Sequence, residues 1–372
     1  MKVLFWTQQY WPYIGGVEVL SRQFIADMRT RGVEFSVITG HGNLDLPDED
    51  EVDGVPVHRF GFLQALATRD AREILRIRQR VAALKRRIEP DLVHFNLTDP
   101  SLFFHLQTAS ASVPSLVAIR LALPPTAADE KTLLGQALEN SAWVTANSGA
   151  ILEDLHHIAP YTKERSSLVY NGYPMPFTAP TELSFELPKL VCIGRLVEEK
   201  GFDLAIKALA RLLPDFPELR LTIAGDGSAR RDLEALAQEL GVSDLVDFVG
   251  WVNPEDMPQL LNTATIVVMP SRWREAFGLV ALQAAQMARP IVATRVGGLP
   301  EVVRHGETGL VVEPESPEAL VEGIRQLLGN PDGTRAMGQR ARLWAQRQFG
   351  WERYVDEYQQ LYTRLIQEAK SL

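Results

Sequence analysis

The chain has 372 residues, and at roughly 100 to 200 residues per domain this length predicts two or three domains. Hydrophobic residues make up 46% of the sequence and charged residues 23%, which is close to the average for globular proteins and excludes a largely disordered or fibrous chain. Lys and Arg number 38 against 47 Asp and Glu, so the formal net charge is −9, and a general nucleic-acid binder is excluded because it needs a basic face.

Short apolar segments alternate with amphipathic helical patterns along the whole chain. In the first half we expect β-strands at Lys2–Thr7, Glu34–Thr39, Asp91–Phe95, Ser115–Ile119 and Ala142–Ala146. In the second half we expect them at Lys189–Ile193, Arg220–Ala224, Val246–Val249, Thr265–Met269 and Pro290–Ala293. Nearly all-apolar strands alternating with helices predict parallel sheets covered on both faces, so the fold class is α/β with two Rossmann-like, doubly wound domains.

The start of the chain and its cysteine content predict a cytoplasmic protein. The first apolar run ends at Trp6 and is too short for a signal peptide. We find no stretch of about 18 apolar residues, the length that a transmembrane helix requires. The single Cys192 cannot form an internal disulfide, which is typical of a reducing compartment.

Two charged segments stand out in the first half. The acidic run Asp45–Asp53 predicts a solvated loop. Residues Arg69–Glu89 carry eight basic and three acidic side chains, and apolar residues recur there at spacings of three and four, which predicts an amphipathic helix. Its outward cations fit a solvated face or, alternatively, peripheral contact with an anionic membrane surface or an anionic acceptor.

A Pro- and Gly-rich stretch interrupts the alternation near the middle of the chain, between Asn171 and Pro188. We expect an N-terminal domain over residues 1–172, a linker over 173–188, a C-terminal domain over 189–346 and a C-terminal helix within 347–372. That last segment carries Tyr354, Tyr358 and Leu361 on one side, so it is expected to pack, crossing back to the N-terminal domain.

Three turn-to-helix junctions carry candidate binding residues. Gly15 and Gly16 follow the first strand, where backbone can closely approach a phosphate, although a simple turn explains them equally well. Arg195 and Lys200 follow the strand that opens the second domain, and two cations near a helix start suit a diphosphate. Glu275 follows a later strand, where a carboxylate could accept hydrogen bonds from sugar hydroxyls.

Together and in this order, these motifs resemble the retaining glycosyltransferases of family 4, which have the GT-B fold. The matching motifs cover nearly the whole chain: Tyr10-x-Pro-x2-Gly15-Gly16, Asp91-Leu-Val-His94, Ala146-Asn-Ser148, Asn171-Gly172, Gly194-Arg-x4-Lys200-Gly, Gly225-Asp-Gly227, Pro270-Ser-x3-Glu275-x-Phe-Gly, Gly297-Gly298-x2-Glu301 and Phe349-Gly-Trp351-Glu.

The resemblance implies a role for most of the candidate residues. The second domain would hold a nucleotide-diphosphate sugar, with Arg195 and Lys200 on the diphosphate and Glu275 on the sugar, while the acceptor would bind the first domain. Gly15 and Gly16 would approach the same diphosphate. No cofactor and no metal are expected, because the two cations would stabilise the charge of the leaving phosphate. Further donor contacts are implied at Gly225, Trp251, Val252, Phe277, Gly278 and Leu279.

Two positions depart from the family pattern. Gln283 stands where a second Glu normally binds the ribose, so we expect ribose binding to weaken by about 1–2 kcal/mol. Arg120 stands by strand register where a His is common; it cannot act as a base, but it could bind a phosphate or an acidic acceptor, or it could be structural. For His94 we favour a core position, and for Ser148 a helix cap.

The resemblance predicts a hexosyltransferase that moves a sugar, with retention, from a UDP or GDP sugar to a hydroxyl. The acceptor would be a saccharide, a glycolipid or a small molecule, as in polysaccharide or glycolipid biosynthesis. Two alternatives stay open. A GT-B nucleotide-sugar epimerase would release a changed sugar without an acceptor, and a non-catalytic subunit would bind the donor without turnover.

Overall fold

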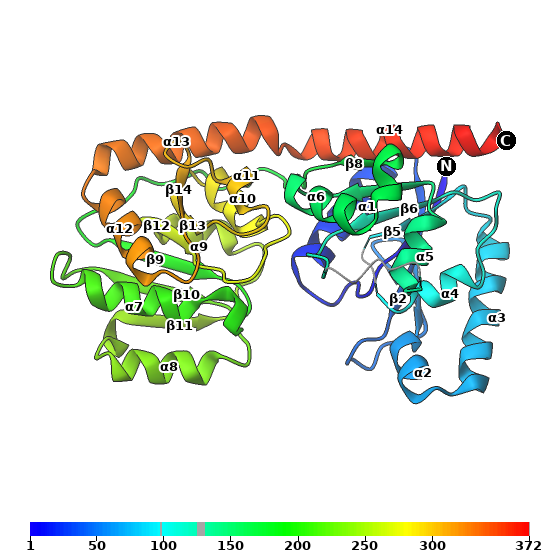
Figure 1. Ribbon diagram of the computed structural model, residues 1–372, viewed down its shortest axis with the longest axis horizontal. Coiled ribbons are helices and arrows are strands. Elements are labelled where there is room, and N and C mark those ends of the chain that lie inside the picture. The colour runs from blue at the N-terminus through cyan, green and yellow to red at the C-terminus, as the bar shows by residue number, and fades with distance from the viewer. Residues whose placement is uncertain (97–98, 125–130, 372) are drawn as a thin grey trace. The chain divides into compact units, whose positions relative to one another are not determined.

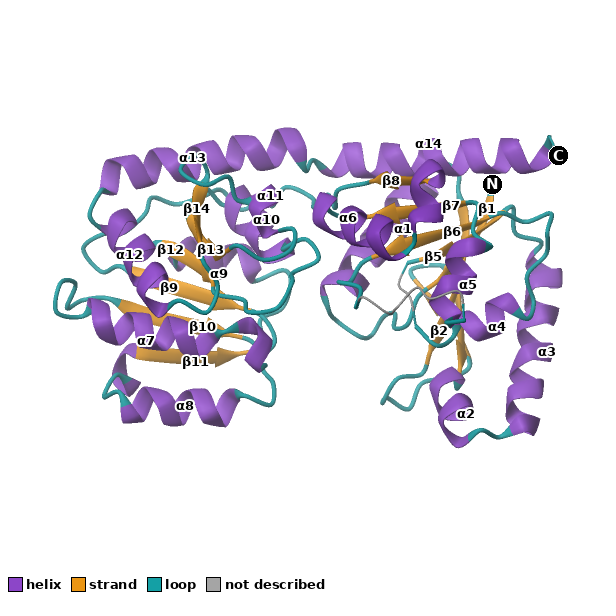
Figure 2. Cartoon of the chain, viewed as in Figure 1, coloured by secondary structure: helices purple, strands orange, loops and turns teal. Residues whose placement is uncertain are grey.

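The structure, a computed structural model, describes residues 1–96, 99–124 and 131–371 (Figure 1). The chain divides into two units, and helices flank the strands in each of them (Figure 2). The first unit comprises residues 1–170 together with 352–372, and the second comprises residues 171–351. The predicted α/β class with two parallel-sheet domains is confirmed.

The described part of the first unit contains one eight-stranded sheet in the order β3-β4-β2-β1-β5-β6-β7-β8. The strands are β1 (Lys2–Trp6), β2 (Glu34–Gly40), β3 (Glu49–Val52), β4 (Val55–Phe60), β5 (Leu92–Phe95), β6 (Ser115–Ile119), β7 (Trp143–Ala146) and β8 (Ser166–Leu168). All neighbouring pairs are parallel except β3 and β4. The order of the parallel strands reverses between β1 and β5, so the loop that carries Gly15 leaves the sheet at a topological switch point.

The prediction of a solvated loop over Asp45–Asp53 is wrong in its second half. Glu49–Val52 forms β3, which pairs antiparallel with β4. Two basic residues of β4 explain why an acidic strand is stable there. Asp50 accepts a 2.7 Å hydrogen bond from the buried Arg59, and Glu49 lies 2.5 Å from Nδ1 of His58. The Arg59 hydrogen bond also lowers the pKa of Asp50.

Helices accompany the strands of the first unit. They are α1 (Gly16–Thr30), α2 (Phe62–Thr68), α3 (Ala71–Ile88), α4 (Leu102–Leu106), α5 (Leu133–Glu139), α6 (Gly149–Ile158), the 3₁₀ turn η1 (Pro160–Arg165) and α14 (Trp351–Lys370). The predicted helix over 69–89 is confirmed as α3, with Ile77, Val81 and Leu84 buried along its seam. The predicted cap is confirmed as well, because the Ser148 side chain accepts a hydrogen bond from the backbone N–H of Ile151.

One lysine of α3 lies on the buried side of the helix. The Nζ atom of Lys85 is 3.1 Å from Nδ1 of His105, 3.3 Å from the carbonyl of Thr108 and 5.6 Å from the centre of the Trp6 ring. Burial lowers the pKa of Lys85 to about 7. It also lowers the pKa of His105 well below the usual value, with the nearby Lys85 charge adding to the effect.

The stability of the first unit should therefore depend on Lys85 in a pH-sensitive way. Between the folded pKa of about 7 and the unfolded value of 10.5, the unfolded chain binds the proton and the folded chain does not. Stability should rise with pH in this window, by at most about 1.4 kcal/mol per pH unit. Lys85→Met should remove that slope. The free energy of unfolding of the variant should therefore exceed that of the wild type most below pH 7, and the difference should disappear towards pH 10.5.

Denaturant unfolding of the two proteins between pH 6 and pH 10 would measure this difference. Lys163→Met serves as the control, since Lys163 is an exposed lysine of η1. Parallel stability curves for the wild type and Lys85→Met would contradict the prediction.

The C-terminal helix α14 completes the core of the first unit. Its residues Tyr354, Tyr358 and Tyr362 are almost fully buried and surround the ring of Phe24 from α1 at centroid distances of 5.3–6.3 Å. Arg31, at the end of α1, forms ion pairs with Glu352 and Asp356 on the same helix. The predicted packing of this helix is confirmed by its contacts with residues of the first unit.

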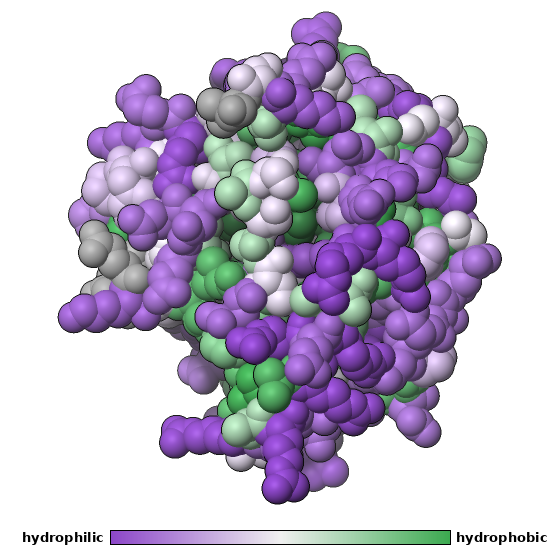
Figure 3. All heavy atoms as spheres, turned by 90° about the vertical axis from the view of Figure 1, so that its right-hand side faces the viewer, coloured by the Kyte–Doolittle hydropathy of each residue, from purple (hydrophilic) through white to green (hydrophobic). Residues whose placement is uncertain are grey.

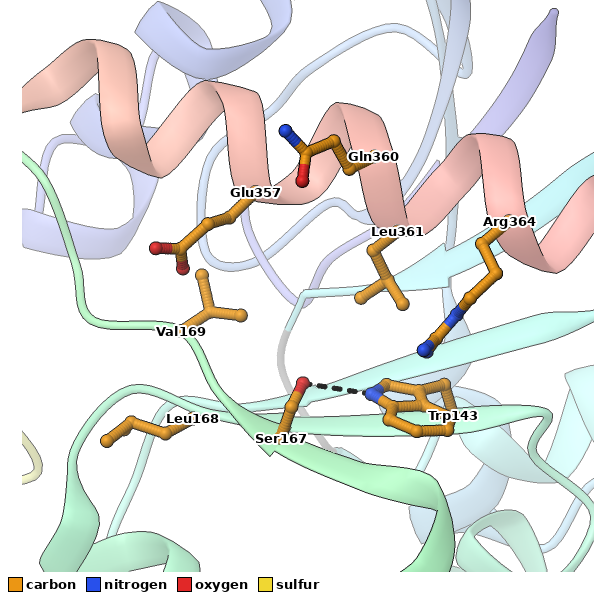
Figure 4. A pocket seen from close by; sticks show the side chains of 8 residues that line it. All are labelled: Trp143, Ser167, Leu168, Val169, Glu357, Gln360, Leu361 and Arg364. Atoms are coloured by element: carbon orange, nitrogen blue, oxygen red, sulfur yellow. Dashed lines mark hydrogen bonds between the residues drawn. The ribbon is translucent and has the colours of Figure 1, made fainter.

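A groove separates α14 from the edge of the sheet formed by β7 and β8 (Figure 4). The guanidinium of Arg364 extends from α14 to within 3.9 Å of the Trp143 ring centre, and the Trp143 indole N–H donates a 2.9 Å hydrogen bond to Ser167. Glu357 and Gln360 also line the groove, and the Glu357 side chain extends towards Val169 (Figure 4). These polar contacts link the helix to the edge strand, while Leu361 and Val169 provide the apolar floor.

The described part of the second unit contains one six-stranded parallel sheet in the order β11-β10-β9-β12-β13-β14. Its strands are β9 (Lys189–Ile193), β10 (Arg220–Ala224), β11 (Val246–Gly250), β12 (Ile266–Met269), β13 (Ile291–Thr294) and β14 (Gly309–Val312). Its helices are η2 (Glu198–Lys200), α7 (Phe202–Leu212), α8 (Arg230–Glu239), η3 (Ser243–Leu245), α9 (Met257–Thr263), α10 (Leu279–Gln286), α11 (Leu299–Val302), α12 (Pro317–Leu328) and α13 (Pro331–Gln348). The strand order reverses between β9 and β12, which places a switch point there.

Residues 173–188, expected to link the domains, form hydrogen bonds with the second unit. The backbone N–H of Thr181 donates to Asn262, and the carbonyl of Ser184 accepts from Thr265. Arg289, which is fully buried, donates to the carbonyl of Thr181. This stretch is therefore fixed along the second sheet rather than extended in solvent.

In the part of the chain that the structure describes, no helix combines the length and the apolar character needed to cross a bilayer.

Candidate active site at the carboxyl edge of the second sheet

The loops that follow β9 and β12 carry the charged candidate residues of the second unit. Because these strands are neighbours at the switch point, their carboxyl ends open side by side. The backbone N–H of Arg272 donates a 2.8 Å hydrogen bond to the carbonyl of Glu199, which joins the two loops directly. The topology thus brings together residues that lie some 75 positions apart in the sequence.

Glycines allow the neighbouring loops to approach this edge. Gly225, after β10, has φ +133°, and a Cβ there would lie 1.8 Å from the carbonyl oxygen of Gly194. Gly297, after β13, has φ +53°, and its Cβ would lie 2.0 Å from the carbonyl oxygen of Glu275. Any other residue at these positions would push the loops apart. Both glycines belong to motifs that the sequence analysis singled out.

Glu275 and Lys200 form an ion pair at the centre of this edge. Their side chains are 16% and 26% exposed, so both are held by the protein and remain reachable from solvent. The hydroxyl of Ser271 donates a 2.7 Å hydrogen bond to the same oxygen of Glu275, Oε1, that accepts from Lys200. A partly buried carboxylate with one oxygen already bonded suits hydrogen bonding to a hydroxylated ligand.

Arg195 lies in the same loop as Lys200 and is exposed. Among the described residues no ion pair to Arg195 is present, so its guanidinium is available to an anion. The helix α7 begins directly after Lys200 and Gly201, and its first backbone N–H groups add a positive partial charge. Two cations and a helix start at one edge form a site suited to a phosphate or diphosphate.

Arg272 and Asp203 are structural residues of the site to which the sequence analysis assigned no role. Arg272 binds Asp203 of α7 through two hydrogen bonds of 2.6 and 2.8 Å and also donates to Glu315. Burial alone would raise the pKa of Asp203, but the bonds from Arg272 and Lys207 bring it below its usual value. This bidentate pair ties the loop of Glu275 to the start of α7. The sequence gives no sign of this pair, because Arg272 and Asp203 lie 69 positions apart and no local pattern connects them.

The other donor-binding candidates of the second unit lie in different surroundings. Phe277 is buried and packs edge-on against Phe349 at 5.4 Å, so its ring belongs to the core. Gly278 precedes α10 with φ +101°, and Leu279 is the first residue of that helix. Gln283 lies one turn further along α10, next to Tyr173.

Two aromatic or apolar candidates follow β11. Trp251 is 54% exposed and Val252 is partly exposed, so the Trp251 ring is accessible next to the loop of Gly225. The backbone N–H of Gly225 donates a 2.7 Å hydrogen bond to the carbonyl of Gly250, which fixes the spacing between these two loops.

The first unit holds the remaining candidates. Gly15 caps the start of α1, and Gly16 is its first residue. Arg120 follows β6 and is buried; it donates hydrogen bonds to Asn96, to the Tyr354 hydroxyl at 2.9 Å and to the Tyr358 hydroxyl at 3.2 Å. These contacts support a structural role, and binding of a substrate by Arg120 stays a prediction.

The prediction of a core position for His94 is confirmed. His94 is fully buried, its Nδ1 is 2.5 Å from the Tyr362 hydroxyl, and its ring stacks on Tyr358 at 5.4 Å. Burial, aided by the charge of Arg120, lowers the pKa of His94 well below the usual value. The imidazole is therefore neutral.

No three His, Cys, Asp or Glu side chains within residues 1–96, 99–124 and 131–371 gather in a way that could hold a metal ion.

Two family models together match most of the sequence. Glycosyltransferase Family 4 matches residues 14–175, and Glycosyl transferases group 1 matches residues 180–344. Together with the two parallel sheets described above, these matches define the GT-B fold. The chain belongs to the group 1 glycosyltransferases of the family 4 type.

Named relatives are similar over part of the chain. A D-inositol 3-phosphate glycosyltransferase of Corynebacterium urealyticum is 32% identical over 249 residues, which cover 62% of this chain and 58% of that protein. A GDP-mannose-dependent alpha-(1-6)-phosphatidylinositol monomannoside mannosyltransferase of Mycolicibacterium smegmatis is 36% identical over 170 residues, 44% of either chain. The matched stretches thus span about half the length of these relatives.

Solved structures share the fold over the full length. Sucrose-phosphate synthase of Thermosynechococcus elongatus has a TM-score of 0.83 at 22% identity and covers 99% of this chain and 100% of its own. HepE of Anabaena, in complex with UDP and glucose, has a TM-score of 0.79 at 22% identity and covers 98% and 99%. At this identity the likeness establishes the GT-B fold alone.

Proposed function

We propose that the protein is a retaining, metal-independent hexosyltransferase that uses a nucleotide-diphosphate sugar and a hydroxyl acceptor. The observation that carries the proposal is the convergence of Lys200 and Glu275 at the switch point of the second sheet, with the exposed Arg195 in the same loop as Lys200. In this arrangement the cations hold the diphosphate and the carboxylate holds the sugar.

In the proposed step, the bond between the anomeric carbon and the diphosphate oxygen breaks while the acceptor oxygen bonds to the same face of that carbon. The acceptor proton passes to the leaving phosphate, so atoms and charge balance. Arg195 and Lys200 stabilise the negative charge that grows on the leaving group, which is where fixed cations lower a barrier most. This role needs neither a protein nucleophile nor a metal.

The base of the donor is uridine or guanosine in this proposal. HepE was solved with UDP and with UDP-glucose, and three relatives are named as GDP-mannose-dependent. The D-inositol 3-phosphate and phosphatidylinositol mannoside names of relatives point to a polar or lipid-linked acceptor of glycolipid or polysaccharide synthesis.

Thermal unfolding with a panel of nucleotides and nucleotide sugars tests the donor class. A ligand at about one hundred times its Kd should stabilise the protein by about 2.7 kcal/mol, and Arg195→Ala should abolish most of the shift. Arg231→Ala, an exposed arginine of α8, is the control and should behave like the wild type. A protein that no nucleotide stabilises would argue against the proposal, whereas donor binding without transfer or hydrolysis would favour the non-catalytic subunit.

We further propose that α2 and α3 make peripheral contact with an anionic membrane surface. Six arginines of the region 69–87 are exposed: Arg69, Arg72, Arg76, Arg78, Arg86 and Arg87. Leu63 of α2 and Leu75 of α3 are 47% and 44% exposed. Figure 3 views the side on which α3 lies in Figure 1, and hydrophobic patches there alternate with hydrophilic side chains. Cations around exposed leucines suit binding at the headgroup level.

Sedimentation with liposomes tests this contact. Arg72→Glu with Arg78→Glu should reduce binding to phosphatidylglycerol-containing vesicles more than tenfold, since each cation near such a surface contributes about 1 kcal/mol. Arg231→Glu with Arg335→Glu changes the net charge equally on the second unit and should bind as the wild type does. Equal sedimentation of all three proteins would leave α3 as a solvated face.

A further inference from the structure

Ser271 occupies a position in the Glu275 loop that the proposed chemistry does not yet use. It directly follows Pro270 after β12 and is only 2% exposed. Its hydroxyl donates a 2.7 Å hydrogen bond to Glu275 Oε1. A serine hydroxyl buried to this degree and directed at a ligand-binding carboxylate restricts how that carboxylate can turn.

The backbone of Ser271 is itself held from a neighbouring strand. The hydroxyl of Thr294, the last residue of β13, donates a 2.6 Å hydrogen bond to the Ser271 carbonyl, and Thr294 is 2% exposed. On the other side, the next residue, Arg272, bonds through its backbone N–H to Glu199. The backbone at Ser271 is thus held by contacts that do not involve the Ser271 side chain. The hydroxyl can therefore be removed by substitution without removing those contacts.

The two oxygens of Glu275 are consequently in different states. Oε1 accepts from both Ser271 and Lys200. Among the described residues nothing is hydrogen bonded to Oε2. With Oε1 held twice, the plane and direction of the carboxylate are set before any ligand arrives, and Oε2 is the oxygen that meets it. Setting the geometry in advance lowers the conformational entropy that the Glu275 side chain must lose when the ligand binds.

We propose that Ser271 is a positioning residue that directs Oε2 of Glu275 towards a hydroxyl of the donor sugar. This inference rests on the proposed function, because it assumes that Glu275 binds the sugar part of a nucleotide sugar. It predicts that Ser271 affects recognition of the sugar and leaves recognition of the nucleoside diphosphate alone, since the cations Arg195 and Lys200 serve the diphosphate.

Calorimetric binding of paired ligands separates these effects without a known acceptor. The probes are UDP with UDP-glucose and GDP with GDP-mannose. For the pair that the wild type prefers, Ser271→Ala should weaken binding of the nucleotide sugar about tenfold, the loss expected for one hydrogen bond to a charged group, and change the Kd of the nucleoside diphosphate less than twofold. Ser271→Thr keeps the hydroxyl and should restore sugar binding to within about threefold.

Ser271→Cys is a second variant, which has nearly the size of serine and a thiol that is a poor hydrogen-bond donor. It should weaken binding of the nucleotide sugar as Ser271→Ala does, so the test still works if one of these two variants is unstable. Ser243→Ala, an exposed serine of η3, is the matched control. If Ser271→Ala and Ser271→Cys bind the nucleotide sugar as the wild type does, or lose nucleoside diphosphate in equal measure, the positioning role is overturned. If the wild type itself binds neither pair, the proposed function fails first, and this inference falls with it.

Discussion

Glu275→Gln is expected to lower kcat/KM for sugar transfer by about 10²- to 10³-fold, the range seen when a preorganised polar contact to the reacting group is removed. The amide keeps the size of the side chain and loses the charge that Lys200 and Ser271 both bind at Oε1. The expected loss falls mainly on kcat, because the sugar must be held most tightly as its bond to phosphate breaks. Steady-state kinetics or slow donor hydrolysis would measure it.

Glu198→Gln is the matched control for this experiment. Glu198 is an exposed acid on the other loop of the same edge, and the change removes the same charge. It should alter kcat/KM by less than about threefold, which is the scale of a surface charge effect. If Glu275→Gln stayed within that same range, Glu275 would have no direct contact with the reacting sugar.

Arg120→Met is expected to destabilise the first unit by about 1–3 kcal/mol, the cost of leaving a buried polar group without its partner. The substitution removes the donor to Asn96 and to the hydroxyls of Tyr354 and Tyr358, and it leaves these groups buried with a partner missing. Chemical denaturation should show the transition of the first unit moving to lower denaturant concentration while that of the second unit stays in place.

Arg295→Met is the control for Arg120, because Arg295 is exposed and pairs with Glu313 at the surface. Such a pair contributes at most about 1 kcal/mol. A fully stable Arg120→Met protein that had lost transfer activity would reverse the interpretation and make Arg120 a substrate-binding residue.

Much of the fold could be predicted from local pattern alone. Ser115–Ile119, Lys189–Ile193 and Arg220–Ala224 are strands in the structure over the very residues predicted. These segments are apolar and buried on both faces, so their hydrophobic runs end where the strands end. The helix α14 was predictable for the same reason, since its buried tyrosines recur at helical spacing.

The β3–β4 hairpin could not be predicted in this way. Glu49 and Asp50 resemble a solvated loop until His58 is known to lie opposite Glu49 and the Arg59 side chain is known to bond to Asp50. Charge pairing across strands depends on register, which the sequence of one strand does not contain.

The sequence identifies candidate residues of the site, but it does not show which of them are in contact. The motif around Glu275 includes Ser271, yet its hydrogen bond to Oε1 appears only when the loop is folded. For Arg120, strand register gave its position at the end of β6. Its tyrosine partners follow 234 and 238 residues later in the chain, and no spacing rule connects them.

The tyrosines of α14 also determine the order in which the two units can complete their folding during synthesis. His94 and Tyr362 are neighbours in the first core although 268 residues separate them. The second unit is one continuous stretch, so it can fold as soon as residue 351 has left the ribosome. The first unit is synthesised earlier and finished later, because its core around Phe24 stays open until α14 is translated. During synthesis, the half of the chain that emerges first is therefore the last to close.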